Sequence, residues 1–116
     1  MNLQQAVDKL VEIIITRDYL EVLVKEEPEE EFTLGLHMSL GRWIRNTWEL
    51  WDPESALSKH FSKLGITHAD DMSSIIMTCA HRQVLGKKWK LPEQIKHFKD
   101  YWKEFDKKLK KEYNGD

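Results

Sequence analysis

Apolar residues recur at intervals of three and four along most of the chain, and this spacing limits the fold more than any other feature. Residues three and four apart share one face of an α-helix, whereas a half-buried strand alternates apolar and polar residues. No segment alternates for long, and the most strand-like run, residues 13–16, is short and lies inside a helical pattern. The sequence therefore predicts an all-α protein, a compact single-domain bundle of five to six helices over residues 1–116.

Composition is that of a small folded domain. Of the 116 residues, 41% are hydrophobic and 33% are charged, and the formal net charge is -2. These values are atypical of disordered chains, and no run approaches the roughly 20 apolar residues that a membrane-spanning helix needs. The single cysteine, Cys79, lies on an apolar helix face and is expected to be a buried free thiol. Because the N-terminus has no signal-peptide pattern, we expect a cytoplasmic protein that does not enter a membrane.

Helix-breaking residues and a change in the balance of charge divide the chain into three parts. The first, residues 2–25, is expected to form a pair of helices. The second, about residues 32–85, holds most of the distinctive motifs, and the third is an amphipathic helix over residues 92–112. Residues 26–31 carry five acidic residues around Pro28 and are interpreted as a loop or the start of a new helix.

Capping residues set the expected helix limits within these parts. Thr16 is expected to cap a second helix that buries Tyr19, and Asp52 is expected to cap a helix that starts at Pro53. Gly65 and Gly86 are expected to follow helix C-termini, because glycine adopts the left-handed conformation there at little cost. The predicted helices span residues 3–14, about 17–25, 33–51, 53–64, about 67–85 and 92–112.

The last predicted helix has its own apolar pattern. Its apolar residues alternate in steps of four and three, a period typical of helices packed along a seam. This seam packs either across the chain's own domain or against a second copy in a homodimer. The ten lysines and four acidic residues in the segment 87–111 favour a solvated face, and the net charge of -2 argues against a nucleic-acid polymer as partner. The seam residues are Leu91, Ile95, Phe98, Trp102, Phe105 and Leu109.

A motif that begins at His37 is the strongest candidate site. On a continuous helix His37, Gly41 and Arg45 share one face. A glycine inside a helix costs about 1 kcal/mol relative to alanine, which favours close approach of a ligand or another backbone at Gly41. Arginine offers a planar fork for a carboxylate or phosphate, and Arg42 and Arg45 lie in one row.

Three tryptophans lie in the same segment, at Trp43, Trp48 and Trp51. Trp48 and Trp51 follow the apolar stripe and are expected to pack in the core. Trp43 falls between the stripe and the arginine row, where an exposed ring could stack on a base or another planar ligand.

A second cluster, His68, Asp70 and Asp71, lies at the predicted start of the helix over about residues 67–85. Its carboxylates suit the positive end of a helix dipole and could cap that helix or pair with an arginine of the first motif. A carboxylate that faces a ligand is one alternative, and a divalent metal held together with His37 is another. The spacing matches no metal motif, and no nucleophile turn or glycine-rich phosphate loop is present, so we expect no cofactor and no resident metal.

The two clusters together resemble an uncharacterised family of small helical domains of unknown function, found in bacteria and their phages. The resemblance covers about residues 32–85 and implies an all-helical unit in which the arginine row and the paired aspartates belong together, without implying a particular activity. A buried network between Arg42 or Arg45 and the aspartates is the simplest physical link. The matching residues are His37-x3-Gly41-Arg42-Trp43-Ile44-Arg45-Asn46-x-Trp48-x-Leu50-Trp51 and Gly65-Ile66-x-His68-x-Asp70-Asp71-Met72-Ser73.

Three functions are compatible with these residues. The first is a non-enzymatic binding protein that sequesters an anionic or nucleotide-like small ligand, as phage proteins do against host defence. The second is a protein-interaction module, an inhibitor or adaptor, that uses the acidic segment 26–31 or the helix over residues 92–111. The third, least favoured, is a metal-dependent hydrolase that uses both clusters. The candidate ligand-binding residues are His37, Gly41, Arg42, Trp43, Arg45, Asn46, His68, Asp70 and Asp71.

Overall fold

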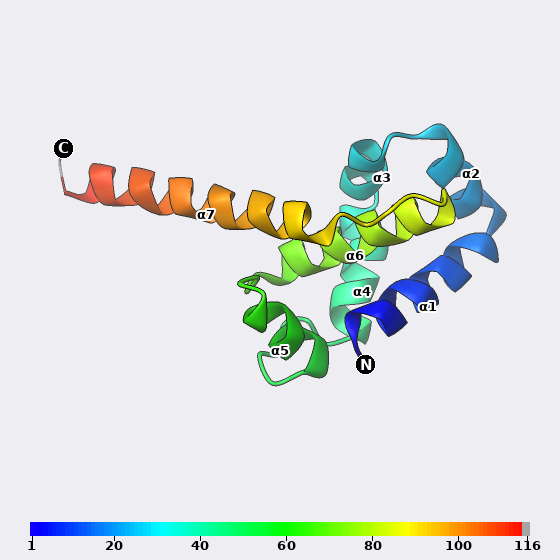
Figure 1. Ribbon diagram of the computed structural model, residues 1–116, viewed down its shortest axis with the longest axis horizontal. Coiled ribbons are helices and arrows are strands. Elements are labelled where there is room, and N and C mark those ends of the chain that lie inside the picture. The colour runs from blue at the N-terminus through cyan, green and yellow to red at the C-terminus, as the bar shows by residue number, and fades with distance from the viewer. Residues whose placement is uncertain (115–116) are drawn as a thin grey trace.

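Residues 1–114, the part that the computed structural model describes, form seven α-helices and one π-helical turn and contain no strand (Figure 1). The predicted all-α class is confirmed, and the predicted count of five to six helices is too low because one predicted helix is split. The elements are α1 (Leu3–Ile15), α2 (Asp18–Glu26), α3 (Glu29–Gly35), the π-turn η1 (His37–Gly41), α4 (Arg42–Thr47), α5 (Ala56–Lys63), α6 (Ala69–Val84) and α7 (Leu91–Tyr113).

Helix α6 is the centre of the fold. Nine of its 16 residues are buried, including Ile75, Ile76 and the free thiol Cys79. Helices α1, α3, α4 and α5 pack around it, and α1 runs beside α6 (Figure 1). A helix that is apolar on several faces must be surrounded by other elements, because each apolar face left in water raises the free energy of the folded state.

Helix α1 is defined at its start by a reciprocal cap. The Asn2 side chain accepts a hydrogen bond from the Gln5 backbone N–H at 2.8 Å, and the Gln5 side chain accepts one from the Asn2 N–H at 2.9 Å. This capping box satisfies two backbone donors that the helix leaves free. The predicted limits of this helix are confirmed, and its buried stripe is Leu3, Ala6, Val7, Leu10 and Ile14.

The predicted limits of the second helix, about 17–25, agree with α2 within one residue, but its predicted cap and burial need correction. Thr16 does not cap it, because Arg17 is the N-cap residue and the Thr16 hydroxyl donates back to the Glu12 carbonyl at 2.8 Å. Tyr19 is exposed, while Leu20 and Val24 are buried. Since α2 lies at the edge of the bundle, only one narrow side of it meets the core.

The predicted single helix over residues 33–51 is wrong. Its first piece, α3, starts earlier, directly after Pro28, so the acidic segment 26–31 holds the end of α2 and the start of α3. In η1 the Gly41 N–H donates to the Leu36 carbonyl at 2.8 Å, five residues back instead of four. This wider turn holds one extra residue and changes which side chains share a face. The last piece, α4, ends at Thr47, and a turn follows.

The predicted cap of the following helix is also wrong. Helix α5 begins at Ala56, and its cap is Ser55, whose side chain accepts from the Ser58 N–H at 3.3 Å. Asp52 instead accepts from the Glu54 N–H at 2.9 Å. Such a local bond stabilises a turn in place of a helix start.

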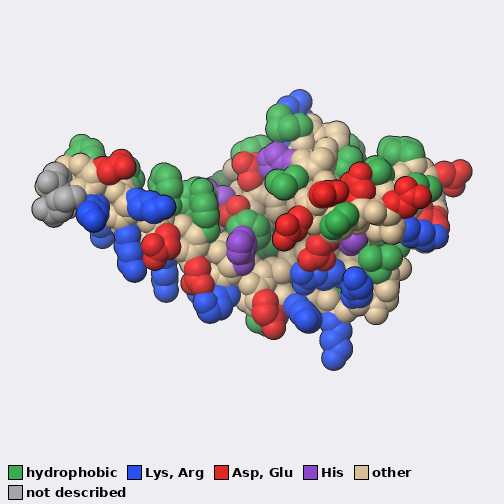
Figure 2. Space-filling view, turned by 90° about the horizontal axis from the view of Figure 1, so that it is seen from above, with side chains coloured by type: hydrophobic (Ala, Val, Ile, Leu, Met, Phe, Trp, Pro, Cys, Tyr) green, Lys and Arg blue, Asp and Glu red, His purple; other side chains and the backbone are tan. Residues whose placement is uncertain are grey.

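Helix α7 leaves the body and runs away from it (Figure 1). None of its 23 residues is buried, and only its first half contacts the core, through Leu91, Ile95 and Phe98. The radius of gyration is 15.3 Å, whereas a globular domain of this length has about 13 Å. Figure 2 shows apolar side chains and lysines along this projection. No described helix combines the length and the apolar composition needed to cross a bilayer.

Candidate functional site

Arg45 is the most constrained residue of the predicted site. Its side chain is 4% exposed, although it carries a positive charge. One terminal nitrogen donates to the Ser73 hydroxyl at 2.9 Å, and the other donates to the His37 carbonyl at 3.0 Å. The guanidinium also lies over the Trp51 ring, at 5.8 Å from its centre. Arg45 therefore joins η1, α4 and α6 from the inside and is not available to an external ligand.

Gly41 makes room for this guanidinium. A Cβ atom at position 41 would lie 2.9 Å from the terminal nitrogen Nη1 of Arg45 and 3.3 Å from the Cε of Met77. Because Arg45 is buried and its nitrogen is hydrogen-bonded to Ser73, it cannot move away without breaking that bond. The space at Gly41 is thus filled by the side chain of Arg45, and not by the ligand or second backbone that was predicted there.

Asp70 supplies the counter-charge at the outer edge of this cluster. Its Oδ1 lies 3.5 Å from Nε of Arg45 and 3.7 Å from Nε2 of His37. Nε of Arg45 has no hydrogen-bond partner among the described residues. The predicted link between the arginine row and the aspartates is found for Arg45 and Asp70, while Arg42 is exposed and makes no ion pair with any described residue.

Five of the nine predicted site residues are exposed, namely Arg42, Trp43, Asn46, His68 and Asp70. Trp43 is 42% exposed and packs edge-on against Trp48, at 5.7 Å between ring centres. Trp51 was expected in the core but is 59% exposed, and its N–H donates to the Asn46 side chain at 3.0 Å. The reason is that α4 ends before Trp51, so this ring no longer follows the apolar stripe of a helix.

The second cluster divides between two structural roles. His68 is the N-cap residue of α6, and its ring stacks on Trp102 of α7 at 3.8 Å. Asp71 accepts a hydrogen bond from the Trp102 N–H at 2.8 Å. Partial burial raises the pKa of the Asp71 carboxyl despite that bond. His68 and Asp71 therefore hold α7 against the body, while Asp70 belongs to the Arg45 cluster.

Neither Asp70 nor Asp71 caps α6 with its side chain, which corrects that prediction. Both lie in the first turn, where a carboxylate still interacts favourably with the helix dipole. Because the two carboxylates point to different partners, they do not converge on one point.

The side chains proposed as metal ligands do not form one cluster in the described part of the chain. Within the described part of the chain, no group of three or more His, Cys, Asp or Glu side chains could hold a metal ion. His37 and Asp70 lie close together, whereas His68 and Asp71 face Trp102. Cys79 is buried, and burial raises the pKa of its thiol to about 11. A thiol with this pKa is protonated at neutral pH and is a poor nucleophile.

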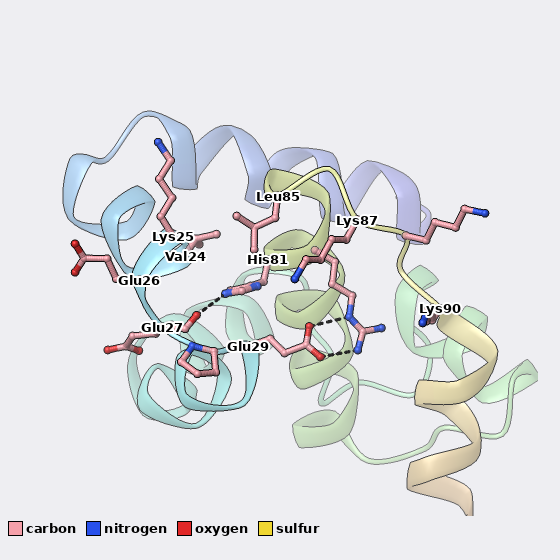
Figure 3. Close-up of a pocket in the computed structure, with 12 residues that line it drawn as sticks. Val24, Lys25, Glu26, Glu27, Glu29, His81, Leu85, Lys87 and Lys90 are labelled. Carbon is pink, nitrogen blue, oxygen red and sulfur yellow. Dashed lines mark hydrogen bonds and ion pairs between the residues drawn. The ribbon is translucent and has the colours of Figure 1, made fainter.

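A groove that the sequence did not predict lies where α6 ends beside the junction of α2 and α3 (Figure 3). It has a volume of about 740 Å³. Arg82 and Glu29 form a two-pronged ion pair on its wall, at 2.8 and 2.6 Å, and this lowers the pKa of the Glu29 carboxyl. Arg82 also donates to the Trp89 carbonyl. Four lysines border the groove, Lys25, Lys87, Lys88 and Lys90.

His81 is buried beside the same groove. One of its ring nitrogens, Nε2, lies 3.2 Å from the Glu27 carbonyl, and the other, Nδ1, has no partner among the described residues. The lysine run of residues 87–90 was a visible signal in the sequence. The pairing of Arg82 with Glu29 was not, because these residues lie far apart along the chain.

Comparison with known proteins adds one finding. No curated protein and no solved structure matches the chain. A family model described as a domain of unknown function (DUF6794) matches residues 1–84. The match covers the N-terminal helices, which the predicted resemblance left out, and it ends with α6, so α7 lies outside it. Since the match spans most of the chain, the protein belongs to the DUF6794 family.

Proposed function

We propose that this chain is a non-enzymatic protein-interaction module in which the α1–α6 body presents α7 to a protein partner. One observation carries the proposal. The apolar stripe of α7 continues beyond the body, where Tyr101, Phe105 and Leu109 are 56%, 45% and 51% exposed.

An exposed apolar stripe of this kind is stabilised when the surface of another protein buries it. An isolated helix gains little stability from its own hydrogen bonds, and most helices in proteins depend on packing of an apolar face. Aromatic side chains that line up on an exposed helix are typical of the buried centre of protein interfaces. Helix α7 therefore has the composition of a helix that docks onto another surface.

The geometry favours this function over a ligand site at the predicted arginine row. The two terminal nitrogens of Arg45 donate to Ser73 and His37, and the side chain is only 4% exposed, so an external anion does not reach this guanidinium. Arg42 of that row is exposed, as are its neighbours Trp43 and Asn46.

Site-specific photo-crosslinking in the native host tests the proposal. A photoreactive phenylalanine analogue replaces Phe105 or Leu109, and a control carries it at Lys110, which is turned about 140° from Phe105 and about 100° from Leu109 around α7. We expect discrete protein adducts at positions 105 and 109 and none, or far fewer, at position 110. Equal labelling at all three positions, or no discrete adduct at any, would contradict the proposal.

A second candidate function is the sequestration of a small anionic ligand, and the groove at the end of α6 favours it. Four lysines border this groove, and Arg82 adds a fifth positive charge against three glutamates (Figure 3). Titration calorimetry with inorganic pyrophosphate and with nucleotides tests it. We expect binding heat that disappears in a Lys87→Glu/Lys88→Glu chain and persists in a Lys110→Glu/Lys111→Glu chain. No heat from any of these anions would remove this candidate.

A further inference from the structure

A second groove runs between α3 and the first half of α7, over the outer side of α6. It has a volume of about 480 Å³. Leu34 and Phe98 give it apolar walls, and Thr33 and Thr78 lie within it, joined through their hydroxyls at 3.4 Å. Glu30 and Glu93 border it without an ion-pair partner among the described residues. Lys90 and the Arg82–Glu29 ion pair also border it, so the groove has apolar walls and charges of both signs at its edge.

The same side of α7 continues outward as the exposed aromatic stripe. His97 and Phe98 line the groove, and Tyr101 and Phe105 follow them by one and two helical turns. The groove and the outer stripe thus form one continuous surface. Its inner half is a groove with apolar walls and charges of both signs at its edge. Its outer half is apolar with lysines beside it (Figure 2).

We infer that the partner of α7 is a second copy of this chain, whose α7 runs antiparallel to the first and lays its outer half in the groove. This inference rests on the proposed function, because it names the partner of that helix. A two-fold axis at Tyr101 brings the outer half of each helix onto the inner half of the other. Each groove is then filled by the stripe of the partner copy, and the contact is self-complementary as two-fold interfaces require.

The charges along this side of α7 agree with that arrangement. In antiparallel helices, a residue before the axis faces the residues that lie at the same distance after it or one position to either side. Lys90, the N-cap residue of α7, lies eleven positions before Tyr101, and Glu112 lies eleven after it. Glu93 lies eight before and Lys108 seven after. Both pairs bring opposite charges together across the interface.

The apolar residues obey the same symmetry. Phe98 lies three positions before Tyr101, and Phe105 lies four after it. The aromatic rings of one copy therefore meet those of the other at both ends of the axis. His97 and Glu104, at four before and three after, form a further polar pair.

The opposite side of α7 does not suit such pairing. The groove on that side is bordered by Lys96, Lys99 and Lys103, with Asp100 as its single acid. Lys96 is already paired with Asp100 at 2.5 Å. Two copies joined through that side would bring lysines against lysines, which opposes association.

A charge swap tests the inference on the full chain. Sedimentation velocity over a range of concentrations is expected to show a monomer–dimer equilibrium. Lys108→Glu replaces two attractive pairs by two repulsive ones in each dimer and is expected to weaken association by about tenfold. The chain with both Glu93→Lys and Lys108→Glu restores the opposite charges, and its dimer constant is expected to return to within about threefold of the original.

Lys103→Glu is the matched control, since it makes the same change of charge on the other side of α7, and it is expected to leave the dimer constant unchanged. Circular dichroism checks that each chain keeps its helices. A chain that stays monomeric at every concentration would overturn the inference, as would a double variant that associates no better than Lys108→Glu.

Photo-crosslinking at Phe105 separates this inference from the proposed function. An adduct of twice the chain's mass supports both. An adduct with a different protein alone leaves the interaction module standing but overturns the second copy as partner.

Discussion

Gly41 and Arg45 show how a single atom decides the role of a charged residue. Arg45 reaches Ser73 only because position 41 has no Cβ. The cation is buried but keeps two neutral hydrogen-bond partners and a carboxylate, Asp70, at 3.5 Å. A buried charge with such partners is tolerated, whereas removal of one partner leaves an uncompensated charge.

Gly41→Ala is expected to destabilise the fold, although alanine is the better helix former. The new methyl group would displace the Arg45 guanidinium from Ser73, and we expect a loss of about 1–3 kcal/mol in the free energy of unfolding. Gly35→Ala is the control, because nothing lies within 4 Å of its Cβ position. That change should leave stability equal or raise it by up to about 1 kcal/mol. Urea denaturation measures both, and equal effects would refute the steric explanation.

The ion pair of Glu29 with Arg82 gives stability a pH dependence. Arg82 holds the pKa of the Glu29 carboxyl below its ordinary value of 4.5. The carboxylate therefore stabilises the fold above pH 4.5, and this contribution is lost as the pH falls through the lower folded-state pKa. Glu29→Gln is expected to cost about 1–2 kcal/mol at pH 7, because the pair is partly exposed, and almost nothing near pH 2. Denaturation at both pH values measures this difference, and a cost independent of pH would contradict it.

At the scale of elements, the helices α4, α5 and α6 share one geometry at their C-termini. In each, the residue after the cap has a positive φ angle, and the next N–H donates five residues back. Gly65 and Gly86 occupy this position in α5 and α6, as the sequence predicted, while α4 has Glu49 with φ of 53°. A residue with a Cβ is strained in this region, and that strain was not visible in the sequence.

Glu49→Gly is expected to stabilise the protein by about 0.5–1 kcal/mol, because it removes this strain. Gly86→Ala makes the reverse change at the equivalent position of α6, where no atom lies within 4 Å of the added Cβ. It is expected to destabilise by about 1 kcal/mol. Thermal denaturation of both chains provides the comparison. A destabilised Glu49→Gly chain would show instead that the Glu49 side chain contributes stability at this turn.

The predicted limits of the elements were accurate where local signals agreed. Helices α1, α6 and α7 lie within one or two residues of the expected positions, because each has an uninterrupted stripe and a clear cap, glycine or proline. The prediction for the segment 33–51 was wrong, because the apolar spacing of this segment fits one helix while the chain forms a π-turn at His37–Gly41. The extra residue of that turn is stabilised by the contacts of Arg45 with α6, which no local pattern reveals.

At the scale of the whole molecule, the body and α7 differ in how they are stabilised. All 20 residues of the buried apolar core belong to residues 3–80. Helix α7 adds only partly buried residues at the edge of this core and the stack of Trp102 on His68. The family match also ends with α6. The body therefore holds the elements that a stable fold requires.

A chain of residues 1–88 is expected to fold without α7. Its unfolding should remain cooperative, with a free energy lower by about 2–3 kcal/mol because partly buried apolar contacts are lost. The matched deletion of residues 1–17 removes five core residues of α1 and should abolish cooperative unfolding. Circular dichroism during urea titration distinguishes the two. Loss of the cooperative transition in the 1–88 chain would show that α7 is part of the folding unit.

The sequence by itself determined the all-α class, most helix limits, the free buried cysteine and the special position of Gly41, because these follow from spacing and backbone preference within short segments. Only the tertiary structure decided that Arg45 is internal while Arg42 is exposed, that His68 and Asp71 hold α7, and that Trp51 faces solvent. Burial depends on contacts between residues far apart in the chain. A motif can therefore name the residues that act together without telling whether they face solvent or one another.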